Sequence, residues 1–169
     1  HVAKVAVLGL AQARDPQLAQ WIEANATFPC TMVDRIVPAA TPETLQEIAD
    51  QLGVYDPCAI ACEPFRQWVI EDNFVNGRPD WDKVGAQFVA DVVPFEMMKL
   101  RMLNGAHSAL AYIGLGAGHD YVHQAIADPA IRPVIDRLMR DEAAPTIDAA
   151  PGQDLAAYAD ALLERFANP

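Results

Sequence analysis

The sequence has few cysteines and no long apolar run. Its three cysteines, Cys30, Cys58 and Cys62, cannot form a complete disulfide framework, and the C-x3-C spacing of the last two lacks a second pair of zinc ligands. We therefore expect buried thiols and no metal site. No apolar stretch reaches the length of about 18 residues that spans a bilayer, and no signal-peptide pattern is present. These absences predict a cytoplasmic protein.

Positive charge is also scarce. The 169 residues carry 12 Lys and Arg against 23 Asp and Glu, a formal net charge of −11. A nucleic acid or an anionic membrane attracts a basic surface, so neither is expected as a partner. With 52% hydrophobic residues, the chain is long and apolar enough to bury a core.

Motifs that bind a phosphate or a metal are missing as well. The one cluster of glycines, Gly114–Gly118, follows a helical pattern instead of a strand, which favours a helix ending and close packing over a phosphate-binding loop. His119 and His123 are four residues apart but have no third ligand beside them. We expect them to be surface or helix-capping histidines.

The patterns that are present predict a mainly α fold with a few short strands in the first half. A helix over 2–24 should divide at Asp15-Pro16, and Thr41-Pro42 should open a helix that Gly53 closes. Strands are expected at 31–37, 58–63 and 66–72, pairing as a small sheet. A turn-rich segment then leads to helices that begin near Phe88 and continue almost to the last residue.

The helical stretch from Pro94 to Gly118 contains Lys99, Asn104 and His107 in an otherwise largely apolar run. At about 100° per residue, His107 lies near 80° and Asn104 near 140° from Lys99, with Glu96 near 60°, so all four share one arc. One interpretation pairs Lys99 with Glu96 and bonds the other two side chains to a neighbouring helix. The other is a general base with two donors for a developing alkoxide.

Three motifs together resemble the long-chain mannitol dehydrogenase family, which includes mannitol 2-dehydrogenase, related polyol dehydrogenases and fructuronate reductase. FPCTMVDRIVP (28–38) is similar to the family signature, and KLRMLNGAH (99–107) resembles its K-x4-N-x2-H catalytic element. EPFRQWVIED (63–72) lies between them, as in the family. The resemblance extends over essentially the whole chain.

The resemblance implies a metal-independent secondary-alcohol dehydrogenase that interconverts a polyol and a ketose with NAD or NADP. It assigns Lys99 as the general base and places Asn104 and His107 on the substrate oxygen. Asp34 matches a position that lines the substrate and nicotinamide region. Glu96 is a candidate proton relay. The implied partners are small molecules: a polyol, a ketose or a sugar acid.

The family's Rossmann domain has a glycine fingerprint that this sequence lacks, so the resemblance predicts that the Rossmann domain is absent. Residues 1–40 would then be a remnant of that domain and its connection, and 41–169 a helical C-terminal substrate domain, truncated at its end. The cofactor would be bound mainly by the missing domain, with no cofactor-binding residue here, and the fragment alone would be inactive. A fructuronate reductase-type enzyme and a non-catalytic helical binding domain remain as alternatives.

Overall fold

The computed structural model describes residues 2–169, which form two compact units. The first extends to Ala90 and the second comprises Asp91–Pro169. The boundary expected from sequence lies between residues 40 and 41, whereas packing divides the chain between Ala90 and Asp91. Each unit is described by itself. No helix in the described part of the chain is long and apolar enough to cross a membrane.

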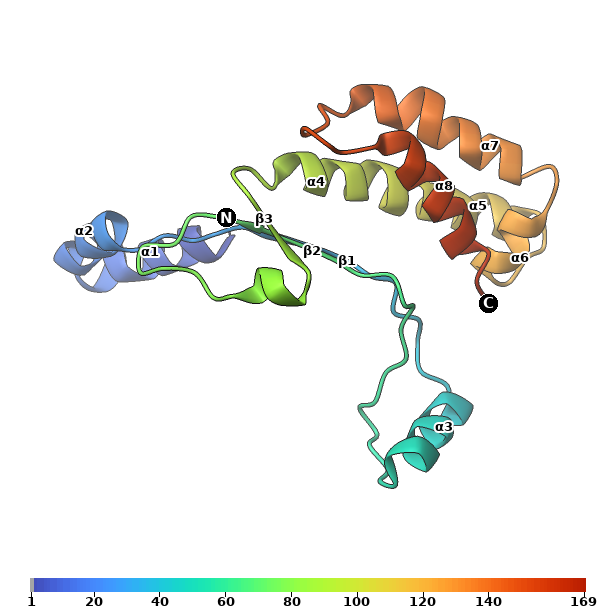
Figure 1. Ribbon diagram of the computed structural model, residues 1–169, viewed down its shortest axis with the longest axis horizontal. Coiled ribbons are helices and arrows are strands. Elements are labelled where there is room, and N and C mark those ends of the chain that lie inside the picture. Colours follow the sequence, from blue (N-terminus) through green and yellow to red (C-terminus); the bar gives the residue numbers. More distant parts are fainter. Residues whose placement is uncertain (1) are drawn as a thin grey trace. The chain divides into compact units, whose positions relative to one another are not determined.

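The first unit begins with two helices, α1 (Val2–Arg14) and α2 (Pro16–Asn25), which pack against each other (Figure 1). Asp15 separates them because its carboxylate accepts hydrogen bonds from the backbone N–H groups of Gln17 (2.9 Å) and Leu18 (3.3 Å). An acceptor at this position satisfies donors that have no partner inside the helix. The predicted division at Asp15-Pro16 is confirmed.

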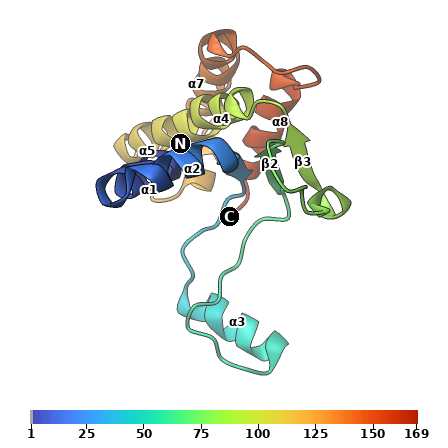
Figure 2. The ribbon, with the colours of Figure 1, turned by 90° about the vertical axis from the view of Figure 1, so that its left-hand side faces the viewer.

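A third helix, α3 (Pro42–Leu52), follows a Thr41 cap and buries no residue (Figure 2). The Thr41 hydroxyl accepts from the Thr44 N–H at 3.2 Å. At the other end Gly53 has φ 71°, a left-handed conformation that glycine adopts without the steric cost of a side chain. Both predicted boundaries of this helix are confirmed.

Three short strands form one sheet in the order β1 (Thr31–Asp34), β2 (Gln67–Glu71), β3 (Ala86–Val89). The first pair is antiparallel and the second parallel. Val69, at the centre of the middle strand, is fully buried. The predicted strands in 31–37 and 66–72 are therefore present, though shorter than expected.

Three predictions about the first unit are wrong: a strand over 58–63, buried thiols at Cys58 and Cys62, and a helix that begins near Phe88. Cys58–Glu63 forms no strand, and Cys58 and Cys62 are exposed while Cys30 is half-buried. The segment expected to begin a helix near Phe88 is instead β3, which pairs with β2 in parallel. Local patterns favoured a helix there, but pairing with a strand distant in sequence determines the conformation.

The second unit is built from helices joined by loops, with no strand among its described residues. Its longest element is a continuous helical run in which a π-helical segment, here called the π turn, interrupts the α-helix (Figure 1). The run consists of α4 (Val93–Met98), the π turn (Lys99–Asn104) and α5 (Gly105–Gly116). The remaining elements are α6 (Val122–Ala127), α7 (Arg132–Arg137), a second π segment (Leu138–Ala143), a short 3-10 segment (Ala144–Thr146) and α8 (Leu155–Phe166).

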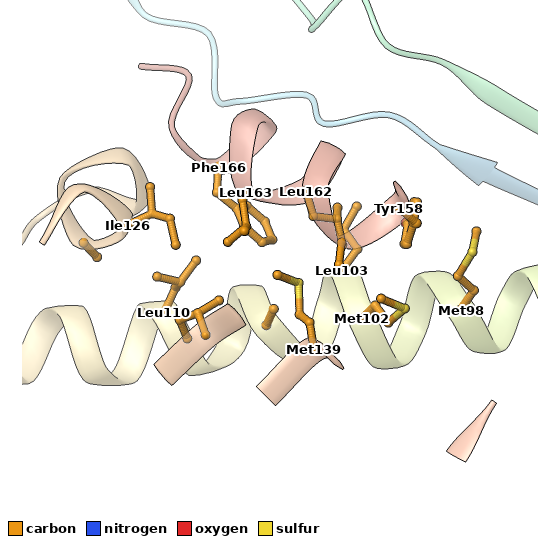
Figure 3. Packing of buried hydrophobic residues seen from close by; sticks show 14 of the residues in the cluster. Met98, Met102, Leu103, Leu110, Ile126, Met139, Tyr158, Leu162, Leu163 and Phe166 are labelled. Atoms are coloured by element: carbon orange, nitrogen blue, oxygen red, sulfur yellow. The ribbon is translucent and has the colours of Figure 1, made fainter. Parts of the chain in front are cut away.

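The long helical run buries every fourth residue: Met98, Met102, Ala106 and Leu110. In an α-helix a spacing of four residues drifts by about 40° per step, so the last of them would turn away from the core. The π turn has more residues per turn and takes up part of this drift. These side chains consequently stay on the side that faces Tyr158, Leu162, Leu163 and Phe166 of α8 (Figure 3).

The glycines at the C-terminal end of α5 have the two roles expected from their sequence context. A Cβ on Gly114 would lie 2.7 Å from the Cβ of Ala125, so only glycine lets α5 approach α6 this closely. Gly118 has φ 90°, and the His119 N–H bonds back to the Gly114 carbonyl at 2.9 Å. The cluster thus combines close packing with a helix ending.

Candidate functional site

Lys99 is the first residue of the π turn and Asn104 is the last. The wide turn shows in the hydrogen bond from the Gly105 N–H to the Leu100 carbonyl, five residues earlier. In such a segment residues i and i+5 are neighbours on successive turns, as i and i+4 are in an α-helix. The π turn therefore places Asn104 one turn beyond Lys99. His107 follows three residues later in α5, on the same side of the helix.

One alternative is that these polar groups only support the fold. It predicts that the side chains of Lys99 and Asn104 have bonding partners, and none is seen among the described residues. Lys99 is half-buried and forms no ion pair with the exposed Glu96. Asn104 is half-buried, and its contact with Ser108 is through the main chain, where its carbonyl accepts from the Ser108 hydroxyl at 2.9 Å. The side chains of Lys99 and Asn104 therefore remain available to a ligand.

His107 is exposed and its ring contacts Phe166 of α8, with ring centroids 6.2 Å apart and an interplanar angle of 51°. Sequence reasoning missed this contact because the two residues are far apart in the chain. It also missed Gln153, whose amide nitrogen lies 3.3 Å from the Pro94 carbonyl and 3.2 Å from the Met98 sulfur. These contacts from the C-terminal part of the chain lie at Pro94 and Met98, just before the candidate site, and at His107 within it.

The π turn also has a contact with a later part of the chain. The Arg101 guanidinium donates to the carbonyl of Thr146, in a short 3-10 segment before α8. Arg101 is exposed, so the bond lies at the surface of the unit. Together with the buried Met102 and Leu103, this contact holds the middle of the π turn against the rest of the second unit.

Asp34 is the last residue of β1 and is fully buried. The following residues are tied to Glu63: the Arg35 guanidinium donates two hydrogen bonds to the Glu63 carbonyl (2.9 and 2.8 Å), and the Ile36 N–H donates to its carboxylate at 2.5 Å. The VDR segment is thus held by the residue that opens the second family-like motif. Asp34 belongs to the first unit and the Lys99 group to the second.

The histidines beyond the candidate site have structural contacts. His119 pairs with Asp128 at 3.0 Å, and His123 stacks on Tyr121. The Ala130 N–H and then His119 hold the pKa of the Asp128 carboxyl below its usual value. In residues 2–169 no three His, Cys, Asp or Glu side chains are grouped so that they could hold a metal ion.

Comparison with protein families identifies the chain. Residues 91–169 match the mannitol dehydrogenase C-terminal domain, and residues 1–83 match the mannitol dehydrogenase Rossmann domain. These ranges follow the two compact units closely. The chain belongs to the mannitol dehydrogenase family.

The second match corrects the fold prediction, in which the Rossmann domain is absent. Residues 1–83 belong to that domain. The prediction relied on the missing glycine fingerprint, which is a single loop. The strands and helices of the rest of a Rossmann domain are set by their own apolar patterns, so the absence of that loop does not exclude them.

Three relatives show how close the similarity is. The chain is 77% identical over its whole length to D-mannonate oxidoreductase of Escherichia coli strain K12, of which it covers 35%. A D-sorbitol dehydrogenase structure in substrate-free form superposes with a TM-score of 0.90 at 42% identity, over 99% of this chain and 34% of that one. The Pseudomonas fluorescens mannitol 2-dehydrogenase complex with NAD and D-mannitol gives 0.86 and 42%, with the same coverage. The chain thus spans about a third of the length of these relatives.

Proposed function

We propose that the full-length protein is an NAD(P)-dependent dehydrogenase that oxidises a secondary alcohol of a linear sugar derivative, or reduces the corresponding ketone. The observation that carries this proposal is the π turn, which puts a lysine, an amide and an imidazole along one side of a helix in a member of the mannitol dehydrogenase family. In this proposal Lys99 accepts the proton of the substrate hydroxyl. Asn104 and His107 donate hydrogen bonds to the same oxygen as negative charge develops on it.

Two further residues have auxiliary parts in the proposal. Glu96 lies three residues before Lys99, is exposed, and is proposed to exchange protons between the lysine and solvent. Asp34 is proposed to contact the substrate from the first unit. This role is the one that the family resemblance of the VDR segment implies.

The cofactor supplies the hydride acceptor or donor. In the first unit, the strand followed by an α-helix is β1, and the segment from Arg35 to Thr41 that joins it to α3 contains no glycine. These residues do not fit the phosphates of a dinucleotide, which need a glycine loop that leads into a helix N-terminus. We therefore propose that residues other than these bind the phosphates, and that the 169 residues alone have no turnover. Metal independence and a cytoplasmic location also remain predictions.

We favour a sugar acid of the D-mannonate type as substrate and keep a mannitol-type polyol as the second candidate. The 77% identity to D-mannonate oxidoreductase, against 42% to the mannitol 2-dehydrogenase structure, supports this order. The two substrates differ in a terminal carboxylate, whose recognition needs a cationic or hydrogen-bonding group.

The test is a substrate panel for the full-length protein, run with NAD and with NADP. It contains D-mannonate, D-mannitol and D-sorbitol, with a chelator added in a parallel series to test metal independence. We expect the highest kcat/KM with D-mannonate and no effect of the chelator. Absence of turnover with all three alcohols and with their ketones would refute the proposed function.

A further inference from the structure

We propose that Phe166 is a positioning residue for this reaction, whose ring sets the orientation of the His107 imidazole. The inference rests on the proposed function, in which His107 donates a hydrogen bond to the substrate oxygen. It adds a residue from α8 that none of the family-like motifs contains.

Phe166 is itself held rigidly. It is the last residue of α8, is 2% exposed, and belongs to the cluster that includes Leu162 and Leu163 (Figure 3). Close packing on all sides leaves such a ring a single low-energy position. The core packing therefore holds the Phe166 ring in one position at the end of α8.

His107 differs from Phe166 because it is exposed and has few constraints of its own. Within residues 2–169 its ring forms no hydrogen bond or ion pair, and its ring contact is the one with Phe166 at 6.2 Å. The second side-chain torsion of histidine has a broad energy minimum, so an imidazole without neighbours points its N–H groups in many directions. A fixed ring beside it, tilted by 51°, excludes part of that range.

This restriction matters for chemistry because a donor stabilises an oxyanion only where it points at the oxygen before the reaction starts. Removing the ring should leave the imidazole in place but widen its range of orientations. The wider range of orientations should lower kcat/KM for the alcohol substrate. This loss should occur only when His107 is present.

The experiment compares Phe166→Leu, Phe166→Tyr and Leu162→Val in the full-length protein, with kcat/KM and Tm measured for each. We expect Phe166→Leu to lower kcat/KM by about tenfold and Phe166→Tyr, which keeps the ring, to stay within about twofold. Leu162→Val removes volume from the same helix and the same core cluster without removing a ring from His107. It should lower Tm but leave kcat/KM within about twofold.

A double-mutant comparison separates positioning from general loss of structure. In a His107→Ala background, Phe166→Leu should change kcat/KM by less than about twofold, because there is no imidazole left to orient. The inference is overturned if Phe166→Leu has the same effect with and without His107, if it has no effect in the wild type, or if Leu162→Val lowers kcat/KM equally.

The contact itself is tested by NMR of the His107 ring protons, assigned by their loss in His107→Ala. Phe166→Leu should move these signals more than those of His119 and His123, because the ring current of Phe166 acts nearby, and Phe166→Tyr should move them least. If the His107 signals do not respond to Phe166→Leu, the inference fails. Lack of turnover in the wild-type protein refutes the proposed function instead, so the two failures are distinguishable.

Discussion

At the residue scale, Asn104 and His107 share the proposed task of holding the substrate oxygen. Replacing either by alanine in the full-length protein removes one donor and should lower kcat by about 10²-fold. Ser108→Ala is a matched control, because its exposed hydroxyl bonds only to the Asn104 carbonyl of its own helix. Steady-state kinetics measure all three variants. A loss for Ser108→Ala that equals the loss for Asn104→Ala would contradict the assignment.

The His119–Asp128 pair gives a pH-dependent prediction at the same scale. The pKa of Asp128 is lowered in the folded protein, chiefly by the Ala130 N–H and then by His119. The carboxylate therefore stabilises the fold above its unfolded pKa of about 3.9, and this contribution is lost as pH falls through the folded value. Asp128→Asn should lower the urea midpoint of the chain at pH 7. It should not change the midpoint at a pH below the folded pKa of Asp128, where the wild-type carboxyl is also uncharged. An equal lowering of the urea midpoint at both pH values would contradict this explanation.

At the scale of elements, the crossing of α5 and α6 depends on Gly114. Gly114→Ala introduces a Cβ that would lie 2.7 Å from the Ala125 Cβ, so the helices must separate. We expect a loss of about 1–3 kcal/mol in the free energy of unfolding. Gly116→Ala is the matched control on the same helix, because a Cβ there meets nothing within 4 Å. Alanine at that position should be neutral or stabilise by up to about 1 kcal/mol.

Urea unfolding of the two variants measures the difference between them. The reverse order, with Gly116→Ala the less stable variant, would show that the close approach of α5 and α6 does not determine the stability of this unit.

Elements defined by local signals were predicted well from sequence, and elements defined by distant contacts were not. Asp15 and Thr41 marked helix starts because a cap acts within a few residues. β3 was missed because it depends on pairing with β2, and Cys58–Glu63 was predicted as a strand although no partner strand pairs with it. The Lys99, Asn104 and His107 spacing was visible in the sequence. The π turn that sets their geometry was not, although the four-residue spacing of Met98, Met102, Ala106 and Leu110 is a signal for it.

At the scale of the whole molecule, the chain combines part of a Rossmann domain with a helical C-terminal domain of the mannitol dehydrogenase family. The sequence motifs predicted the family. They did not predict the Rossmann part, because that prediction relied on the absence of one glycine loop. Asp34 belongs to the first unit and Lys99 to the second, and each is proposed to act in the full-length protein. We expect the 169-residue chain to show no turnover with D-mannonate and NAD(P), whereas the full-length protein does. Turnover by the isolated chain would contradict the proposal that these 169 residues alone are inactive.

The central claim is that Lys99 is the general base, and substituting it tests this most directly. Lys99→Ala in the full-length protein should lower kcat by about 10²–10⁴-fold while the KM for the cofactor stays near its wild-type value. Added methylamine should restore part of the rate, because a small amine can enter the space left by the lysine side chain and accept the proton. Lys83→Ala, at an exposed lysine paired with Asp80, serves as the control and should change neither value. Near wild-type turnover of Lys99→Ala with every active substrate would contradict the account.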